Sequence, residues 1–160
     1  MILYLLRHAD AEAQHAEGDA ARGLTVAGAR AMRAAAPVWR RLEVEPDVVL
    51  SSPLVRALQT ARLLREGVGG PPPTEDERLA PGATWERLAD ALGEHPGARS
   101  ILVVGHEPDL SRIVAEATGA GSVRMRKGGM ACIEFDGVPQ PGSGELAWLL
   151  DPDLYADDGG

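Results

Sequence analysis

The chain has 160 residues, 44% of them hydrophobic and 25% charged, which is the balance of an ordinary globular domain. Its formal net charge of −8 argues against a nucleic-acid partner, because surfaces that bind nucleic acid carry an excess of Lys and Arg. No apolar run approaches the roughly 20 residues of a membrane span. The N-terminus lacks the basic segment of a signal peptide, and the single Cys132 excludes a disulfide within the chain. We therefore expect a cytoplasmic protein with no membrane partner.

Apolar runs alternate with amphipathic segments along the chain, which predicts alternating strands and helices. In chain order, we expect strand 2–6, helix 23–42, strand 47–50, helix 51–66, helix 83–95, strand 100–105, helix 107–119 and strands 130–137 and 144–151. The last two strands form a hairpin in this interpretation. This order predicts an α/β fold, a three-layer α/β/α sandwich with a mostly parallel central sheet.

Several residues mark where these elements begin, bend or end. Thr25 is the expected N-cap of the first helix, and Pro37 is expected to kink or split it. Ser52 is the expected N-cap of the next helix, with a proline directly after it. A short strand is expected near Thr74, within a segment rich in Gly, Pro and acidic residues.

The chain divides into one domain over residues 1–150 and an acidic C-terminal tail over 151–160. The tail, DPDLYADDGG, is expected to be frayed because its charge is acidic and it lies at a terminus. Helix 107–119 is expected to open at Pro108 and to close near Gly119.

Three predicted strands end in side chains that suit an anion site. The first ends at Arg7 and His8, the second leads through Ser52 to Arg56, and the third ends at His106. The carboxyl ends of neighbouring parallel strands meet at one edge of a sheet, where ligands bind. The following helix N-termini would add amide donors and the positive ends of their dipoles. The sequence therefore predicts one pocket lined by two arginines and two histidines.

These residue types point to phosphoryl transfer. Arginine offers planar, bidentate donors to phosphate oxygens, and neutral imidazole is available near pH 7 to attack phosphorus and later leave. We expect Arg7 to hold phosphate and His8 to be the nucleophile. His106 is expected to stabilise the equatorial charge, either protonated or as a hydrogen-bond donor.

The segments that carry these residues resemble the histidine phosphatase, or phosphoglycerate mutase-like, superfamily, and most closely its SixA-type phosphohistidine phosphatases. The resemblance rests on LLRHADAE, LTVAGARA, DVVLSSPLVRALQTA, ILVVGHEPDL and RKGGMACIEFDG, which together cover nearly the whole chain. The family motif R-H-G reads R-H-A here, so Ala9 must avoid positive φ.

The resemblance implies a phosphoglycerate mutase-like fold and a metal-independent phosphatase with no cofactor, in which His8 is transiently phosphorylated. It implies that Arg7, Arg56 and His106 bind the phosphoryl group and stabilise the transition state. Arg22 and Ser52 are further candidates for binding the substrate. The proton donor stays open among three carboxyl groups, Asp19, Glu77 and Glu86.

The substrate also stays open. The short segment 67–95 leaves little room for a lid, so the pocket would admit a side chain on a histidine-phosphorylated protein. The labile P–N bond also needs a weaker general acid than an alkyl phosphate does. One alternative is a small-molecule phosphomonoesterase or mutase, with segment 67–95 closing the site. The other is a non-catalytic domain that binds phosphorylated partners, against which the intact His8 argues.

Two other nucleophiles have less support. Cys132 lies in an apolar strand and lacks the arginine that a cysteine phosphatase needs six residues later. Asp151 and Asp153 follow an apolar strand, as in aspartyl-nucleophile phosphatases, but only seven residues follow Asp153. Histidine spacings typical of a metal site are also lacking in the sequence.

Overall fold

A computed structural model describes residues 1–156, and within them one six-stranded sheet has the order β3-β2-β4-β1-β5-β6. Its strands are β1 (Ile2–Arg7), β2 (Val48–Ser51), β3 (Thr74–Glu75), β4 (Ser100–Gly105), β5 (Met130–Glu134) and β6 (Glu145–Leu150). The strands β1 to β4 run parallel to one another, and β5 pairs antiparallel with both β1 and β6. The mostly parallel sheet, the short strand at Thr74 and the final hairpin are confirmed.

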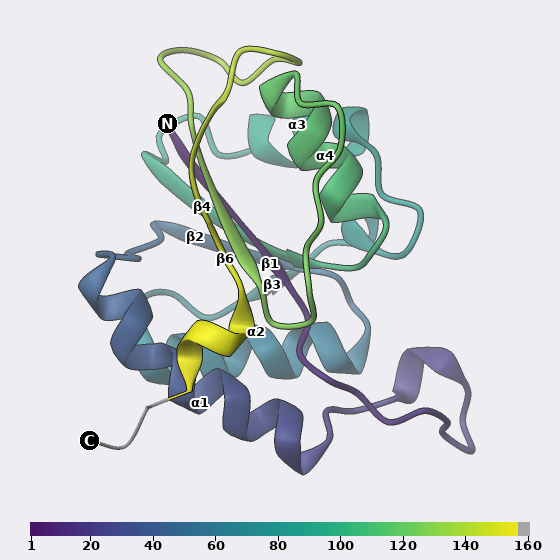
Figure 1. The fold of residues 1–160 in the computed structure, drawn as a ribbon. Coiled ribbons are helices and arrows are strands. Elements are labelled where there is room, and N and C mark those ends of the chain that lie inside the picture. Colours follow the sequence, from purple (N-terminus) through teal and green to yellow (C-terminus); the bar gives the residue numbers. More distant parts are fainter. Residues whose placement is uncertain (157–160) are drawn as a thin grey trace.

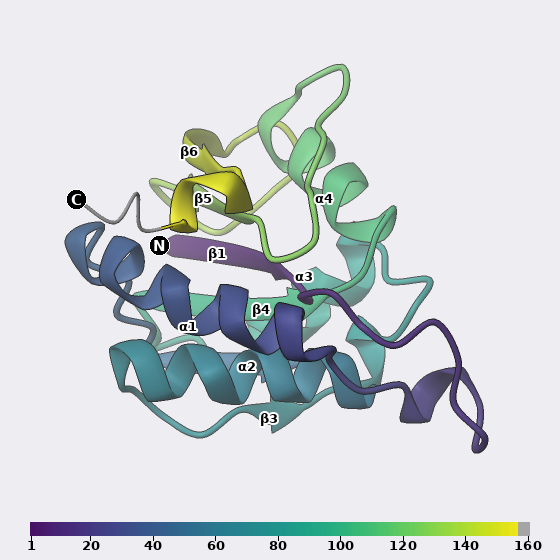
Figure 2. The same cartoon turned by 60° about the horizontal axis from the view of Figure 1, so that its bottom comes forward.

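Two pairs of helices cover the two faces of this sheet (Figures 1 and 2). They are α1 (Val26–Arg41), α2 (Val55–Val68), α3 (Trp85–Gly93) and α4 (Asp109–Thr118). β1 is buried on both faces, so that Leu6 packs on the α1–α2 side and Leu5 on the α3–α4 side. This is the predicted three-layer sandwich, because each helix buries one apolar stripe against the sheet. The described helices are all too short or too polar to span a lipid bilayer.

The predicted split of the helix at Pro37 is wrong, because α1 continues through it to Arg41. Thr25 caps the helix as expected, accepting a hydrogen bond from the Gly28 amide at 3.0 Å. Pro37 lies on the exposed face, where water can satisfy the carbonyl that loses its partner. The fully buried Trp39 packs into the core one turn from the end of the helix, and this packing outweighs the missing hydrogen bond.

The predicted start of α2 is also wrong. The helix begins at Val55, its N-cap is Leu54, and that residue makes no side-chain cap. Ser52 lies in the preceding turn, where its Oγ accepts a hydrogen bond from the Leu54 amide at 3.3 Å. α4 likewise begins one residue later than expected, after Pro108 as N-cap, and it closes at the left-handed Gly119 as predicted.

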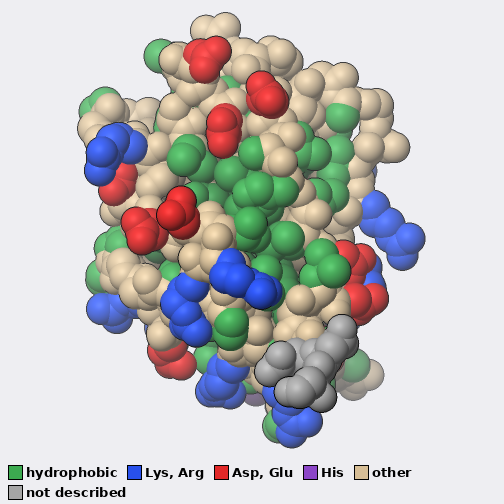
Figure 3. Space-filling model, turned by 60° about the vertical axis from the view of Figure 1, so that its left-hand side comes forward, with side chains coloured by type: hydrophobic (Ala, Val, Ile, Leu, Met, Phe, Trp, Pro, Cys, Tyr) green, Lys and Arg blue, Asp and Glu red, His purple; other side chains and the backbone are tan. Residues whose placement is uncertain are grey.

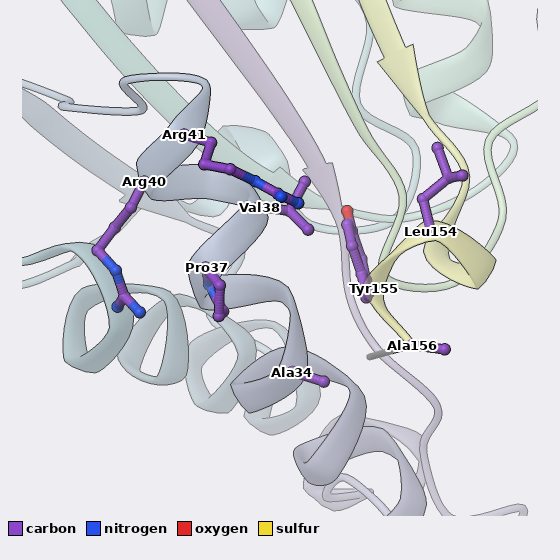
Figure 4. A pocket seen from close by; sticks show the side chains of 8 residues that line it. All are labelled: Ala34, Pro37, Val38, Arg40, Arg41, Leu154, Tyr155 and Ala156. Atoms are coloured by element: carbon purple, nitrogen blue, oxygen red, sulfur yellow. The ribbon is translucent and has the colours of Figure 1, made fainter. Parts of the chain in front are cut away.

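The first half of the predicted frayed tail is ordered. Residues Pro152–Tyr155 form the 3-10 helix η3, which packs against α1 (Figure 4). The Tyr155 ring meets Trp39 edge-on, with centroids 5.7 Å apart, and its hydroxyl donates to the Gly128 carbonyl at 2.8 Å. The sequence analysis missed this contact because one tyrosine in an acidic segment has no periodic pattern. Residues 157–160 lie outside the described part, and the domain boundary at residue 150 stays a prediction.

The acidic pair at the end of β6 has a structural partner. Asp151 and Asp153 both accept hydrogen bonds from Nη1 of Arg126, at 2.8 and 2.6 Å. This ion-pair cluster holds the segment that precedes β5 against the segment that follows β6. It explains the two aspartates without nucleophilic chemistry. Cys132 is buried in β5, where burial raises the pKa of its thiol to about 11, so it is a core residue as expected.

The helices leave part of the sheet uncovered. Figure 3 shows a continuous apolar area on one side of the molecule, with acidic side chains on one flank and Lys or Arg side chains on the other. Ile2 and Trp148 are partly buried on the α1–α2 side of the sheet. Such an area is within the range of an ordinary protein surface.

We expect Tyr155→Ala to lower the free energy of unfolding by about 3 kcal/mol, because it removes a buried aromatic ring from Trp39. Tyr155→Phe removes only the hydrogen bond to Gly128 and should cost about 1 kcal/mol. Urea unfolding measures both values. Leu154→Ala is the control, since Leu154 is 61% exposed and its loss should cost less than about 0.5 kcal/mol. Equal stability of Tyr155→Ala and the native chain would contradict the docking of η3.

Candidate active site

The three strand ends meet as predicted. In the sheet register Arg7 on β1 lies beside Gly105 on β4, and Ser51 on β2 lies beside Val104. His8 and His106 follow these positions, and their ring centroids are 5.2 Å apart. Both side chains are buried, because the parallel strands end beneath the loops that carry them. This convergence brings the two histidines into one site.

A backbone hydrogen bond orients the ring of His8. Its Nδ1 lies 2.7 Å from the carbonyl oxygen of Ala9. A carbonyl only accepts, so Nδ1 carries the ring proton and Nε2 keeps its lone pair. The imidazole is thus held in the tautomer that a nucleophile at Nε2 requires.

Thr60 links this segment to α2. Its Oγ1 accepts a hydrogen bond from the Ala9 amide at 3.1 Å and donates to the Arg56 carbonyl at 2.8 Å. Among the described residues Glu43 is the one non-glycine with positive φ, so Ala9 avoids the left-handed region. The alanine in the R-H-A motif therefore fits the backbone without strain.

His106 and Ser52 form a second oriented pair. Nε2 of His106 lies 2.7 Å from Oγ of Ser52. The Ser52 hydroxyl has no other acceptor for its proton among residues 1–156, so it donates to Nε2 while its oxygen accepts from the Leu54 amide. The ring proton of His106 then sits on Nδ1. Ser52 is thus a partner of His106 rather than the cap of α2.

Two arginines from different elements reach the site. Arg7 donates from Nη1 to the Met125 carbonyl at 2.9 Å. Arg56, whose side chain is 7% exposed, donates from Nη1 to the Asp19 carbonyl at 3.0 Å and from Nη2 to its carboxylate at 3.2 Å. The same carboxylate accepts from Nη1 of Arg22 at 2.9 Å.

Four buried nitrogens of these side chains have no hydrogen-bond partner within residues 1–156. They are Nε of Arg7, Arg22 and Arg56, and Nδ1 of His106. Buried polar groups are normally satisfied, and such exceptions in one cluster point to a ligand. Because all four carry a proton, the group that would satisfy them is an acceptor of hydrogen bonds, such as an oxyanion.

A glycine-rich turn clamps the end of β1. The Gly128 amide lies 3.1 Å from the carbonyls of both Arg7 and His8, and the Arg7 amide donates to the Gly129 carbonyl at 3.0 Å. Gly128 has φ of +79°, and a Cβ there would lie 2.6 Å from Cε of Met32. The turn needs glycine at this position, and it fixes the backbone of the R-H pair from the side of β5.

Burial and positive charge keep both histidines neutral. Burial lowers the pKa of His8 to about 4, helped by the charges of Arg56, Arg7 and Lys127. Burial also lowers the pKa of His106 to about 3. Of the two forms considered for His106, the site without an anion thus favours the neutral hydrogen-bond donor. Burial lowers the pKa of Arg7 as well, against the opposing charge of Glu107.

Of the three carboxyl groups considered as proton donors, Asp19 alone is joined to this cluster. It lies in the 3-10 helix η1 (Asp19–Ala21), in contact with Arg56 and Arg22. Glu77 is exposed in the 3-10 helix η2 (Glu77–Leu79), and Glu86 is exposed in the first turn of α3. Hydrogen bonds to its own backbone amide and to Thr84 lower the pKa of Glu86, and neither glutamate bonds to the cluster in the described part of the chain.

Three residues near the site were missed by the sequence analysis. Glu107 directly follows His106 and lies close enough to Arg7 to oppose the lowering of its pKa. Thr60 links two elements of the site, and it stands in the S-P-x-x-R-A-x-Q-T motif. Lys127 lies near enough to His8 to lower its pKa. Glu107 could have been found from its neighbour, whereas Lys127 depends on how the turn folds.

A metal site is not evident in the described residues. Within residues 1–156 no three or more His, Cys, Asp or Glu side chains are grouped to hold a metal ion. His8 and His106 instead lie among arginines, whose charge opposes a cation. The arrangement is built to hold an anion.

We expect the free energy of unfolding to decrease as the pH is lowered from about 6.5 to 4. Both histidines have lower pKa values folded than the usual 6.5, so the unfolded chain binds more protons there and stability rises with pH. His8 contributes up to about 3 kcal/mol of stability at neutral pH that is lost on acidification, since a shift of one pKa unit corresponds to about 1.4 kcal/mol. Urea unfolding across this range measures the slope.

The control is the double variant His8→Asn, His106→Asn, in which this part of the slope should vanish. His15→Asn, which removes an exposed histidine, should leave the slope unchanged. A slope of native size in the double variant would assign the pH dependence to carboxyl groups instead.

The family model of the histidine phosphatase superfamily (branch 1) matches residues 3–87. The phosphohistidine phosphatase SixA of Escherichia coli is 30% identical over 158 residues, covering 95% of this chain and 94% of that protein. An uncharacterised protein of Picosynechococcus sp. strain PCC 7002 is 33% identical over 146 residues, covering 81% of this chain and 82% of its own length.

A solved structure has the same fold over nearly the full length of the chain. It is that of the protein histidine phosphatase SixA complexed with tungstate, with a TM-score of 0.88 and 27% identity, covering 98% of this chain and 100% of that one. The α/β sandwich is thus SixA-like and phosphoglycerate mutase-like, as the resemblance implied. The chain belongs to the histidine phosphatase superfamily and is a phosphatase that acts on a phosphate-bearing substrate.

Proposed function

We propose that this enzyme is a metal-independent protein phosphohistidine phosphatase that acts through a transient phosphohistidine at His8. The observation that carries the proposal is the hydrogen bond from Nδ1 of His8 to the Ala9 carbonyl, 2.7 Å long. It leaves Nε2 as a free nucleophile inside a cluster of buried cationic donors. Arg7, Arg56 and His106 hold the phosphoryl oxygens in this proposal, and Arg22 and Ser52 support them.

In the first step Nε2 of His8 attacks phosphorus in line with the leaving group. The bond from phosphorus to the substrate nitrogen breaks, and its electron pair passes to the leaving imidazole, which takes up a proton. Positioning and electrostatic stabilisation supply most of the catalysis in such a transfer. The arginines face the equatorial oxygens, where negative charge is spread, and Nδ1–H of His106 donates to one of them.

In the second step water attacks the phosphorus bound to His8. The bond from phosphorus to Nε2 breaks, and its electron pair returns to the ring as the lone pair. The water proton leaves with inorganic phosphate or passes to solvent. The low pKa of His8 favours this step, because a neutral imidazole is the stable product in the buried site.

The position of segment 67–95 supports a protein substrate. Trp85 and Leu88 of α3 are buried in the core between the sheet and α4. The Gly82 amide before the helix donates to the buried Asp109 carboxylate at 2.8 Å. The segment thus packs onto the body of the domain, which favours a site with an open mouth. The relatives named for phosphohistidine and protein histidine phosphatase activity support the same substrate class.

The single cysteine is compatible with a reducing compartment, and we keep the cytoplasm as the proposed location. We also assign the proton donor to Asp19, since it is the candidate in contact with Arg56. Its side chain is 60% exposed, so a leaving imidazole can reach it from solvent.

The test is phosphate release from a histidine-phosphorylated carrier protein in EDTA, with His8→Asn as the inactive control. We expect native turnover in EDTA, its complete loss in His8→Asn, and slower release from a simple phosphomonoester. Rapid quenching should trap acid-labile, base-stable phosphate on the native chain. Turnover of the ester alone would move the substrate to metabolites. Binding of the carrier without turnover would instead support a non-catalytic domain that binds phosphorylated partners.

Asp19→Asn tests the proton donor. We expect it to slow hydrolysis of the phosphomonoester by about 100-fold, within the range for general acid catalysis. Hydrolysis of phosphohistidine should slow less, because its leaving imidazole takes a proton readily. Glu86→Gln and Glu77→Gln are the matched controls at exposed carboxyl groups. A larger loss in either glutamate variant than in Asp19→Asn would assign the acid elsewhere.

A further inference from the structure

Lys127 is the single lysine of a chain that has fifteen arginines, and its charge acts on His8. Its Nζ donates to Oδ1 of Asp10 at 2.8 Å, and the two side chains are 49% and 47% exposed. Asp10 is two residues beyond His8 in sequence, whereas Lys127 reaches it from the other side of β1. The pair therefore spans the edge of the cluster.

Rigid backbone holds both ends of this ion pair. The Gly128 amide next to Lys127 donates to the carbonyls of Arg7 and His8. The Thr25 amide donates to the Asp10 carbonyl at 3.0 Å, and a Cβ on Gly28 would lie 2.2 Å from that same oxygen. The two residues thus keep their place beside His8, whatever the ammonium group does.

The ammonium group is free to change partners at small cost. Oδ2 of Asp10 accepts from the Thr25 hydroxyl at 2.9 Å, so the carboxylate keeps one partner when Lys127 leaves. The oxygen that is released is exposed enough for water to solvate it. An exposed ion pair is worth only about 0.2–1 kcal/mol. Lysine suits such an exchange, since its compact charge sits on a flexible stem, unlike the fixed fork of arginine.

The buried donors at the centre of the site belong to Arg7, Arg56 and His106, and they suffice for the oxygens of a phosphoryl group. Lys127 is about half exposed and stands outside them. A cation outside the phosphate donors can reach a part of the substrate other than the transferred phosphoryl group. Its positive charge acts on His8, since it helps to lower the pKa of that ring.

We propose that Lys127 is a specificity-determining residue. Its ammonium group exchanges Asp10 for a second anionic group of the substrate, outside the transferred phosphoryl group. This inference rests on the proposed phosphate pocket and adds a second chemical group that the site recognises on its substrate. The second group is a carboxylate, either of an acidic side chain beside a phosphohistidine or of a small phosphorylated acid. Asp10 is the positioning residue that holds the lysine until the substrate arrives.

The experiment measures binding of non-hydrolysable probes by calorimetry. The probes are ω-carboxyalkylphosphonates with two to four carbons, each compared with the n-alkylphosphonate of the same length. The flexible chains let the carboxylate find the lysine without a presumed distance. We expect at least one carboxylated probe to bind native protein about three- to tenfold more tightly than its partner, the range for one charge-assisted hydrogen bond in a partly exposed place.

Variants assign that preference to its residue. Lys127→Met should bring the affinity ratio of each probe pair to about one. Asp10→Asn should raise the ratio, because the lysine no longer has a competing partner. Arg124→Met is the matched control, since it removes one exposed positive charge from the same segment and should keep the native ratio.

The single lysine also permits a direct readout. Reductive dimethylation with ¹³C-formaldehyde keeps the charge and labels Lys127 and the Met1 amine. Met1, which donates to the Phe135 carbonyl at the far end of β1, is the internal reference. The carboxylated probe should shift the Lys127 signal, and the alkylphosphonate should shift it much less.

The outcomes separate the two proposals. Equal affinity of both probe classes for native protein, or a preference that survives in Lys127→Met, overturns the role of Lys127 while the phosphate pocket stands. If no phosphonate binds at all, the phosphate pocket and this inference both fall. Phosphohistidine peptides with Asp or Asn beside the phosphohistidine distinguish the two sources of the carboxylate. If native protein prefers the Asp peptide and Lys127→Met removes this preference, the carboxylate belongs to a protein substrate.

Discussion

The hydrogen bond from Nδ1 of His8 to the Ala9 carbonyl depends on contacts from α2, the Gly128 turn and η3. It needs the backbone after β1 to turn back toward the ring, and that backbone is held from two sides. Thr60 on α2 binds the Ala9 amide, and the Gly128 turn binds the carbonyls of Arg7 and His8. Tyr155 in turn binds the Gly128 carbonyl from η3. A small shift in any of these contacts would turn the ring, and a phosphoryl transfer tolerates little misplacement.

Charge imposes the second constraint. The chain has a net charge of −8, yet the site buries or half-buries several cations at the strand ends. Three of these cations have a carboxylate beside them, since Asp19 pairs with Arg56 and Arg22, and Asp10 pairs with Lys127. These carboxylates limit the cost of crowding positive charges. The carboxylates do not bind the buried Nε atoms of the arginines or Nδ1 of His106, which therefore stay available to another hydrogen-bond acceptor. The result is an anion site inside an acidic protein.

The sequence alone allowed the strands, the helices and the four central residues to be predicted, because each depends on a local pattern. Apolar runs with turn residues mark buried strands wherever they occur, and Arg7, His8, Arg56 and His106 follow from where those strands end. The errors have a common cause in packing. Pro37 is tolerated since the carbonyl it leaves without a partner, that of Arg33, lies on the exposed face of α1. Ser52 is drawn away from capping by His106, which is 54 residues distant.

Local sequence patterns suffice to predict the fold class, the edge of the sheet where the candidate site lies and the residue types found there. The tertiary structure alone decided the proton positions on the two rings, since these depend on Ala9 and Ser52 as hydrogen-bond partners. It also separated Asp19 from Glu77 and Glu86, and it brought Lys127 to Asp10 across 117 residues. Such choices need distances between segments that no local pattern encodes, because a side chain's role is set by what the folded chain places beside it.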